Sequence, residues 1–228
     1  MKRTRRVGAP TTVRKYNAKK SKKNMVSTFT SKNSTAGGIT NILPVKMLYA
    51  DTFLLNPGAL GNVATQIFRL SSIHDPDFTG VGHQPLGHDQ LEPLFERYQV
   101  WKVDFEIEGL SLDNQPQGFA YRISDDSTTS TDPRVVLENG NGEFTLIGSD
   151  QDHKSYRGSI MLNTVHGIGY KQYMANDDYG AAFGANPLES AYLHINVDGC
   201  GTDTNGLRLR VRLTYHVKLM GSKLTALS

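Results

Sequence analysis

The sequence contains a single cysteine, Cys200, so it can form neither an intrachain disulfide nor a cysteine-based zinc site. It has no run of 18 apolar residues, and we therefore expect no membrane span. Positive charge at the start of the chain, MKRTRRVGAP, is not followed by an apolar segment, so we expect no secretory signal. Acidic residues are absent from residues 1–24.

Those first 24 residues form a basic arm, whose ten cations are Lys2, Arg3, Arg5, Arg6, Arg14, Lys15, Lys19, Lys20, Lys22 and Lys23. Residues 25–228 carry the other 15 cations and all 22 acids, a net charge of −7. A basic tail on an acidic body is typical of proteins that bind polyanions. We expect the arm to be disordered when free and to bind nucleic acid by displacing counterions from phosphates, without reading sequence. The alternatives are a solubilising tail or a nuclear signal in KRTRR and KKSKK.

After the arm, residues 25–45 are rich in Ser, Thr, Asn and Gly and predict a linker, and residues 46–228 predict one domain. Short apolar runs separated by turn residues predict strands at 46–55, 63–73, 100–110, 118–124, 143–149, 156–165, 190–198 and 207–220. Helical spacing of apolar residues predicts a short helix at 89–98, capped by Asp89, and a second helix is expected at 132–139. Eight strands with almost no helix indicate an all-β fold, an eight-stranded antiparallel jelly roll with short helices in its loops.

Strict alternation marks two of these strands. Leu207 to Leu219 alternate apolar and polar over thirteen positions, and Trp101, Val103, Phe105 and Ile107 share one face of the strand at 100–110. In a jelly roll the last strand lies beside the third, which would set Arg208, Arg210, Arg212 and Lys218 opposite Asp104, Glu106 and Glu108. Cross-strand pairing and nucleic-acid binding are both open for these cations.

The loop DPDFTGVGHQPLGHDQ, residues 75–90, concentrates aspartates, histidines, glycines and prolines. It lacks the spacing of a calcium loop, although calcium bound by Asp75 and Asp77 at a subunit contact remains an alternative. The chain has no HExxH, Gly-x-Ser-x-Gly or phosphate-loop motif. We therefore expect no enzyme, no catalytic residue, no metal and no cofactor.

Residues 71–102, SSIHDPDFTGVGHQPLGHDQLEPLFERYQVWK, resemble a segment of the capsid proteins of small circular Rep-encoding single-stranded DNA (CRESS-DNA) viruses. The matching residues are Asp75, Pro76, Asp77, Thr79, Gly80, Gly82, His83, Gln84, Pro85, Gly87, Asp89, Tyr98 and Val100.

This resemblance implies a virion protein that assembles into a T=1 icosahedral shell of about 60 copies around single-stranded DNA held by the arm. It also implies passage through the host nucleus, with a nuclear import receptor as a partner. The loop would be a subunit contact through Asp75, Asp77, Thr79, His83, Gln84 and Asp89. Loops at 125–141 and 166–189 would meet neighbouring subunits as well.

Three alternatives stay open. One is a non-viral jelly-roll module that binds carbohydrate or nucleic acid. Another is the coat protein of an RNA virus, because a basic arm binds either nucleic acid. The third, a cupin-type enzyme, needs clustered histidines with a carboxylate, and the seven histidines are scattered along the chain.

Overall fold

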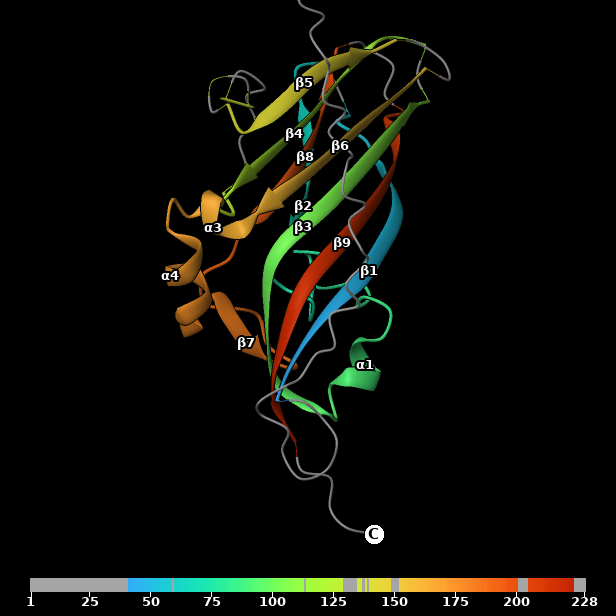
Figure 1. Ribbon diagram of the computed structural model, residues 1–228. Coiled ribbons are helices and arrows are strands. Elements are labelled where there is room, and N and C mark those ends of the chain that lie inside the picture. Colours follow the sequence, from blue (N-terminus) through green and yellow to red (C-terminus); the bar gives the residue numbers. More distant parts are fainter. Residues whose placement is uncertain are drawn as a thin grey trace, which may run out of the picture. The chain divides into compact units, whose positions relative to one another are not determined.

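The computed structural model describes residues 41–58, 60–112, 114–128, 135–136, 138, 140–148, 152–200 and 205–223 (Figure 1). The strands in these ranges are β1 (Ile42–Leu55), β2 (Val63–Arg69), β3 (Phe95–Ser111), β4 (Gln117–Ser124), β5 (Gly142–Ile147), β6 (His153–Met161), β7 (Gly180–Ala182), β8 (Tyr192–Gly199) and β9 (Leu207–Ser222). The helical segments are α1 (His88–Leu91), α3 (Leu162–Val165), α4 (Tyr170–Ala175) and the 3-10 turn η1 (Asp177–Tyr179).

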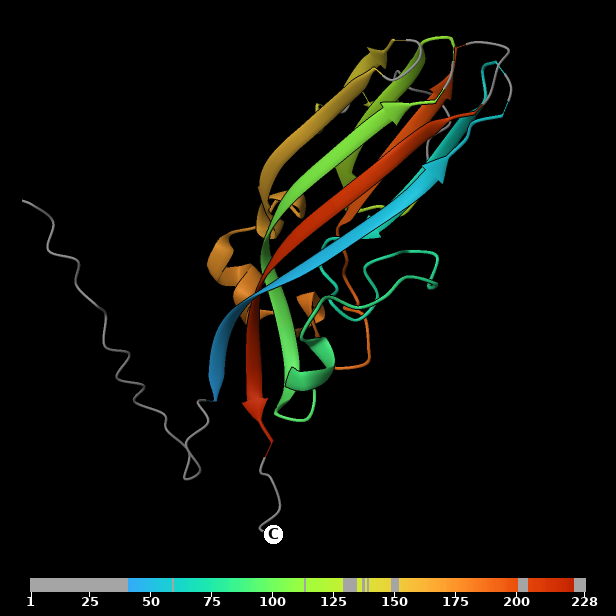
Figure 2. The same ribbon diagram turned by 90° about the vertical axis from the view of Figure 1, so that its right-hand side faces the viewer.

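The strands form two sheets that pack face to face as a sandwich (Figures 1 and 2). One sheet has the order β1–β9–β3–β6, with the short β7 also paired to β3, and the other has the order β2–β8–β4–β5. All the pairings are antiparallel. Apart from β7, these eight strands make a jelly roll, so the predicted fold class is confirmed.

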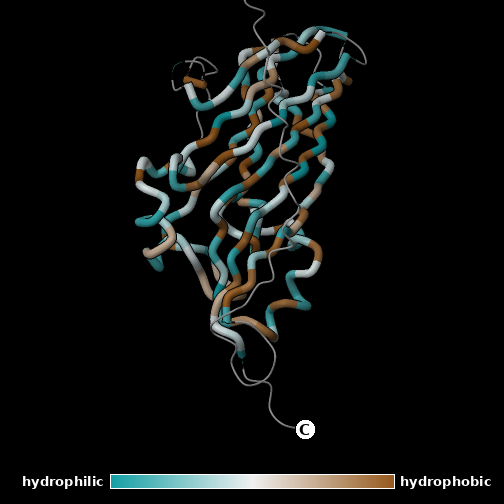
Figure 3. Tube along the Cα trace, in the orientation of Figure 1, coloured by the Kyte–Doolittle hydropathy of each residue, from teal (hydrophilic) through white to brown (hydrophobic). Residues whose placement is uncertain are grey.

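Alternation along each strand determines which side chains enter the core. Leu207, Leu209, Val211, Leu213 and Tyr215 of β9 are all fully buried, whereas the arginines between them are exposed. Figure 3 shows the resulting switch between hydrophobic and hydrophilic residues along the strands. Two buried hydroxyl groups also tie the sheets together. The O–H of Tyr215 donates to the carbonyl of Arg69 at 2.8 Å, and that of Tyr156 donates to the carbonyl of Phe119 at 3.0 Å.

The helix predicted at 89–98 is wrong beyond its first turn. Helix α1 ends at Leu91, and Phe95 already begins β3. Tyr98 pairs with Leu219 of β9 and Ala181 of β7, and this long-range pairing overrides the local helical spacing of the apolar residues. Asp89 is not the cap either, because the helix starts one residue earlier, after Gly87 in the left-handed conformation at φ 93°.

Trp101 does not share a face with Val103, Phe105 and Ile107. The register between β3 and β9 shifts between Val100 and Lys102, and this bulge makes Trp101 an additional residue. Its ring lies 5.3 Å from the ring of His216, edge to face. Because His216 bonds to Asp104 on the side of the sheet away from the core, Trp101 turns toward that side.

Several strands also begin or end at other residues than predicted. Strand β1 begins at Ile42, inside the expected linker, and the strand predicted at 156–165 ends at Met161, where α3 takes over. The predicted arm 1–24 and residues 25–40 of the linker lie outside the described residues, as does most of the helix predicted at 132–139. Among the residues that the structure does describe, no helix combines the length and apolar character needed to cross a membrane.

Candidate subunit-contact loop and basic sheet face

The segment between β2 and β3 contains the 75–90 loop, which folds back onto the end of β2. Asp77 makes an isolated antiparallel bridge with Phe68. The backbone N–H of Arg69 donates to the carbonyl of Pro76 at 2.7 Å, and that of Phe78 donates to the carbonyl of Ile67 at 3.0 Å. The loop is therefore attached to the sandwich through its backbone before any side chain is considered.

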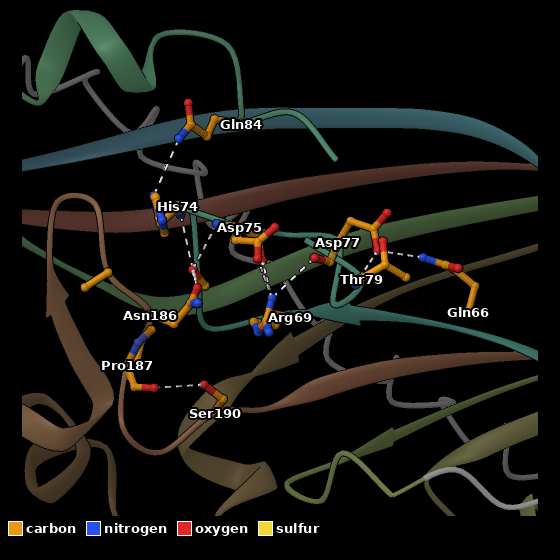
Figure 4. Close-up of polar contacts among 12 residues, drawn as sticks. Gln66, Arg69, His74, Asp75, Asp77, Thr79, Gln84, Asn186, Pro187 and Ser190 are labelled. Atoms are coloured by element: carbon orange, nitrogen blue, oxygen red, sulfur yellow. Dashed lines mark hydrogen bonds and ion pairs between the residues drawn. The ribbon is translucent and has the colours of Figure 1, made fainter. Parts of the chain in front are cut away.

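Arg69 secures the first half of this loop (Figure 4). Its Nη1 lies 2.9 Å from Oδ2 of Asp75 and donates to the carbonyls of Asp75 at 3.1 Å and Asp77 at 3.3 Å. The guanidinium also lies 4.6 Å from the centre of the Phe78 ring. One cation thus neutralises a carboxylate and satisfies two loop carbonyls.

Asp77 is the buried acceptor of the same loop, only 6% exposed. Its Oδ1 accepts from Nε2 of Gln66 at 2.7 Å and from the backbone N–H of Thr79 at 2.9 Å. Gly82 packs against it, because a Cβ at that position would lie 2.6 Å from the Cβ of Asp77. The backbone here approaches so closely that only glycine fits without movement.

Ser72, fully buried, links the loop to the segment that follows β7. Its hydroxyl donates to Oδ1 of Asn186 at 2.6 Å and accepts from the backbone N–H groups of His74 and Asp75. It also lies 3.0 Å from the hydroxyl of Tyr98, which donates to the carbonyl of Ala185. Burial raises the pKa of Tyr98 to about 12, so this phenol keeps its proton at neutral pH.

The remaining predicted contact residues line a cavity of about 520 Å³ within the loop. The ring of His83 stacks on Tyr49 with centroids 4.6 Å apart, and Nε2 of Gln84 lies 3.5 Å from Nδ1 of His74. Asp89 is 74% exposed and reaches Nδ1 of the buried His88 at 3.1 Å. Of the six predicted contact residues, Asp75, His83, Gln84 and Asp89 line this cavity, whereas Asp77 and Thr79 bond to each other outside its lining.

Asp75 and Asp77 do not converge as a pair of metal ligands. One carboxylate faces Arg69 and the other faces Gln66, and a guanidinium beside Asp75 disfavours a second cation there. Within the described part of the chain, the ligand atoms that do come together, within 4.8 Å of one another, belong to His88, Asp89 and Glu92.

The tips of this loop and of the 166–189 loop expose apolar side chains. Val81 and Leu86 are 86% and 88% exposed, and Leu188 is 80% exposed. The backbone N–H of Leu86 donates to the carbonyl of Leu48 at 3.2 Å, which holds this tip beside the edge strand β1. Anchored loops with outward apolar tips are typical of protein–protein contacts.

Across β9, β3 and β6, charged side chains pair on the side of the sheet away from the core. Arg210 Nη1 lies 3.1 Å from Glu108, and Arg212 Nη1 lies 3.7 Å from Glu106. From β6, Arg157 reaches both glutamates. The predicted cross-strand pairing is thus confirmed for Arg210 and Arg212.

Asp104 completes the ladder with different partners. It accepts from Nζ of Lys102 at 2.8 Å and lies 2.7 Å from Nε2 of His216. Burial raises the pKa of Asp104, but the bonds from Lys102, His216 and Ser159 outweigh burial and hold this pKa well below its usual range.

Sequence reasoning did not find the residues that hold the loop. Arg69 and Gln66 are ordinary polar residues of a strand, and Asn186 lies 114 positions from Ser72. One signal could have suggested the role of Arg69, because this residue ends the strand that leads into an aspartate-rich loop. The arm cations lie outside the described residues, so the structure does not place them.

Comparisons with known proteins give a structural likeness only. No protein-family model matches the chain, and no curated protein matches it in sequence. The structure of Cocksfoot mottle virus is similar with a TM-score of 0.51 and 7% identity, over 80% of this chain and 96% of that one. This likeness shows that the fold is one found in a virus particle.

Two further structures are similar at lower TM-scores. A semi-empty virus-like particle of Macrobrachium rosenbergii nodavirus matches with a TM-score of 0.48 and 11% identity, over 95% of this chain and all of that chain. Desmodium yellow mottle tymovirus matches with a TM-score of 0.43 and 13% identity, over 87% of this chain and 99% of that one.

Proposed function

We propose that this protein is a viral capsid subunit, with a structural rather than a catalytic role. The observation that carries the proposal is the jelly-roll fold, with the sheet β1–β9–β3–β6 packed against the sheet β2–β8–β4–β5. This fold is similar to the Cocksfoot mottle virus structure over 96% of that chain. The anchored loop at 75–90, with Val81 and Leu86 pointing outward, provides a surface that contact with a second copy would bury.

The arm supplies the second part of the proposal, the packaging of single-stranded nucleic acid. Ten cations without an acid in residues 1–24 bind phosphates by counterion release, and this binding does not distinguish DNA from RNA. Inside a shell they would concentrate positive charge near the genome while the rest of the chain stays acidic.

Two observations favour different genomes. The resemblance of residues 71–102 to CRESS-DNA virus capsid proteins favours single-stranded DNA. The structural likeness supports the coat protein of an RNA virus at least as well, because Cocksfoot mottle virus is an RNA virus. Passage through the host nucleus and an import receptor belong to the DNA proposal alone.

The experiment that tests this proposal is nuclease typing of native virus particles that contain this chain, because sequence-blind binding in cells that only express the chain would package any nucleic acid present. Nuclease is first added to intact particles, whose contents should be protected, and then to disrupted particles. Digestion of the released contents by DNase would support the DNA proposal, and digestion by RNase alone would support the RNA proposal. Replacing the ten arm cations with glutamine should give particles that contain far less nucleic acid. Unchanged contents in that variant would contradict the role of the arm.

A further inference from the structure

The β1–β9–β3–β6 sheet, which Figures 1 and 2 show as one layer of the sandwich, has one side that faces away from the core. The strand register places a large share of the cations outside the arm on this side. We call it the basic face, and its cations are Lys46, Lys102, Arg157, Arg208, Arg210, Arg212 and Lys218. Its acids are Asp104, Glu106 and Glu108. Residues 25–228 contain 15 cations and 22 acids in all. Seven of these cations but only three of these acids lie on the basic face, which gives it a local charge of +4.

The ion pairs on the basic face leave its arginines accessible. Arg210, Arg157 and Arg212 are 70%, 67% and 57% exposed. By contrast, Glu106 and Glu108 are only 24% and 38% exposed. The carboxylates therefore lie near the sheet and the guanidinium groups extend past them. Because a guanidinium has five N–H donors, a pair with one or two carboxylates leaves donors that point into solvent.

Arg208 is the arginine of this face on β9 that has no carboxylate opposite it. The register sets it between Leu54 of β1 and Leu110 of β3, and none of the ion pairs found among the described residues involves it. It lines a groove of about 340 Å³ together with Arg157, Arg210 and His153, and Glu108 is the single acid in that lining.

A second groove continues across the sheet. It measures about 290 Å³ and is lined by Arg157 and Arg212 along with Asp104 and Glu106. Arg157 belongs to both linings, so the two grooves adjoin at this side chain. Cations thus border a continuous path over β9, β3 and β6.

We propose that the basic face binds the phosphate backbone of single-stranded nucleic acid, as a second contact besides the arm. Arginine suits phosphate because its planar fork donates two parallel hydrogen bonds to one phosphate. The rings in the two linings are those of His153 and the buried Phe105, whereas arginines provide most of the donors, so binding there would rest on phosphate contacts and would not read sequence. This inference rests on the proposed function for its ligand, since a capsid subunit encounters nucleic acid.

The arm and the basic face are connected by a short length of chain. The arm ends at residue 24, and β1 begins at Ile42 beside β9. One strand of nucleic acid could therefore bind the arm and the sheet of the same subunit, and each contact would raise the effective concentration of the other.

The test measures binding of a fluorescent 20-nucleotide oligothymidylate to the dissociated full chain over a series of salt concentrations. The logarithm of the association constant falls linearly with the logarithm of the salt concentration, and each lost phosphate contact makes this negative slope shallower by about 0.7. Such a loss corresponds to about fourfold weaker binding near 0.15 M salt. Arg208→Gln should show this loss. Glu108→Gln should shift binding the other way, because it removes a negative charge from the groove.

Lys171→Gln is the matched control, since it removes the same charge from α4 rather than from the sheet. It should leave the slope of binding against salt unchanged. If the charged residues of the basic face only stabilise the sheet, Arg208→Gln and Glu108→Gln should change the affinity for the oligonucleotide in the same direction or not at all. Either result would overturn the inference. Thermal unfolding of each variant confirms that the fold is intact.

The outcome separates this inference from the proposed function. Binding changes of opposite sign in a chain that never assembles would support the basic face and reject the capsid role. The opposite outcome has two parts: the original chain forms uniform particles, and Arg208→Gln, Glu108→Gln and Lys171→Gln all bind the oligonucleotide as it does. That outcome would support the capsid role and reject binding by the basic face.

Discussion

Arg69 and Asp75 join the end of β2 to the loop that follows it, with 2.9 Å between Nη1 and Oδ2. The same nitrogen donates to the carbonyls of Asp75 and Asp77, so one side chain makes three bonds to the loop. Both partners are largely protected from solvent, 15% and 22% exposed, which strengthens the pair relative to one on an open surface.

Arg69→Ala should lower the free energy of unfolding by about 1–3 kcal/mol, because a carboxylate and two carbonyls lose a charged donor. Urea unfolding measures the change. Arg157→Ala is the control, since that side chain is 67% exposed and its pairs should contribute less than about 1 kcal/mol. Equal losses in the two variants would mean that Arg69 does not anchor the loop.

Asp77→Ala should also destabilise the protein by about 1–3 kcal/mol, since the amide of Gln66 and the backbone N–H of Thr79 lose their acceptor. Asp89→Ala removes a 74% exposed carboxylate from the same loop and should change stability by less than about 0.5 kcal/mol. Differential scanning calorimetry compares the two variants. A larger effect from Asp89 would contradict the buried-anchor role given to Asp77.

Gly82→Ala tests how closely the loop backbone approaches the rest of the structure. The added Cβ would lie 2.6 Å from the Cβ of Asp77 and 3.2 Å from the hydroxyl of Tyr49, so overpacking should cost about 1–3 kcal/mol. Gly169→Ala is the matched control, because no atom lies within 4 Å of a Cβ there. Thermal unfolding should separate the two variants, and similar melting temperatures would show that the loop has room at Gly82.

Asp104→Asn should reduce stability in a pH-dependent way. Folding lowers the pKa of this carboxyl group below its ordinary 3.8, so the native state favours the ionised form. The stabilisation is fully present above that ordinary pKa and is lost as the pH falls through the lower pKa of the folded state. The deficit of the variant, measured by urea unfolding, should therefore be largest at pH 6 and shrink below pH 4. A deficit that grows on acidification would contradict the assigned pairing.

Sequence patterns predicted the fold because alternation reports burial directly. The alternating run from Leu207 to Leu219 became β9, and the prediction that its arginines face the glutamates of β3 follows from jelly-roll order. Periodicity failed where a distant partner decides the structure. Phe95 and Tyr98 have helical spacing, yet pairing with β7 and β9 draws them into a strand, and a bulge turned Trp101 to the other side.

The site was predictable as a segment but not as a set of contacts. The aspartates, glycines and histidines of residues 75–90 identified the loop, and all of them except Asp77 line its cavity. The groups that hold it come from other parts of the chain, such as Arg69 in β2 and Asn186 after β7. No local pattern can reveal partners whose positions depend on how two sheets pack.

Self-assembly of the purified full chain is the most direct test of the central claim. Sedimentation velocity over a range of protein and salt concentrations, with electron micrographs of the fastest species, measures whether closed shells form. The capsid role predicts one fast-sedimenting species of uniform particle size in equilibrium with free subunits. A chain that stays monomeric at every salt and protein concentration would contradict it.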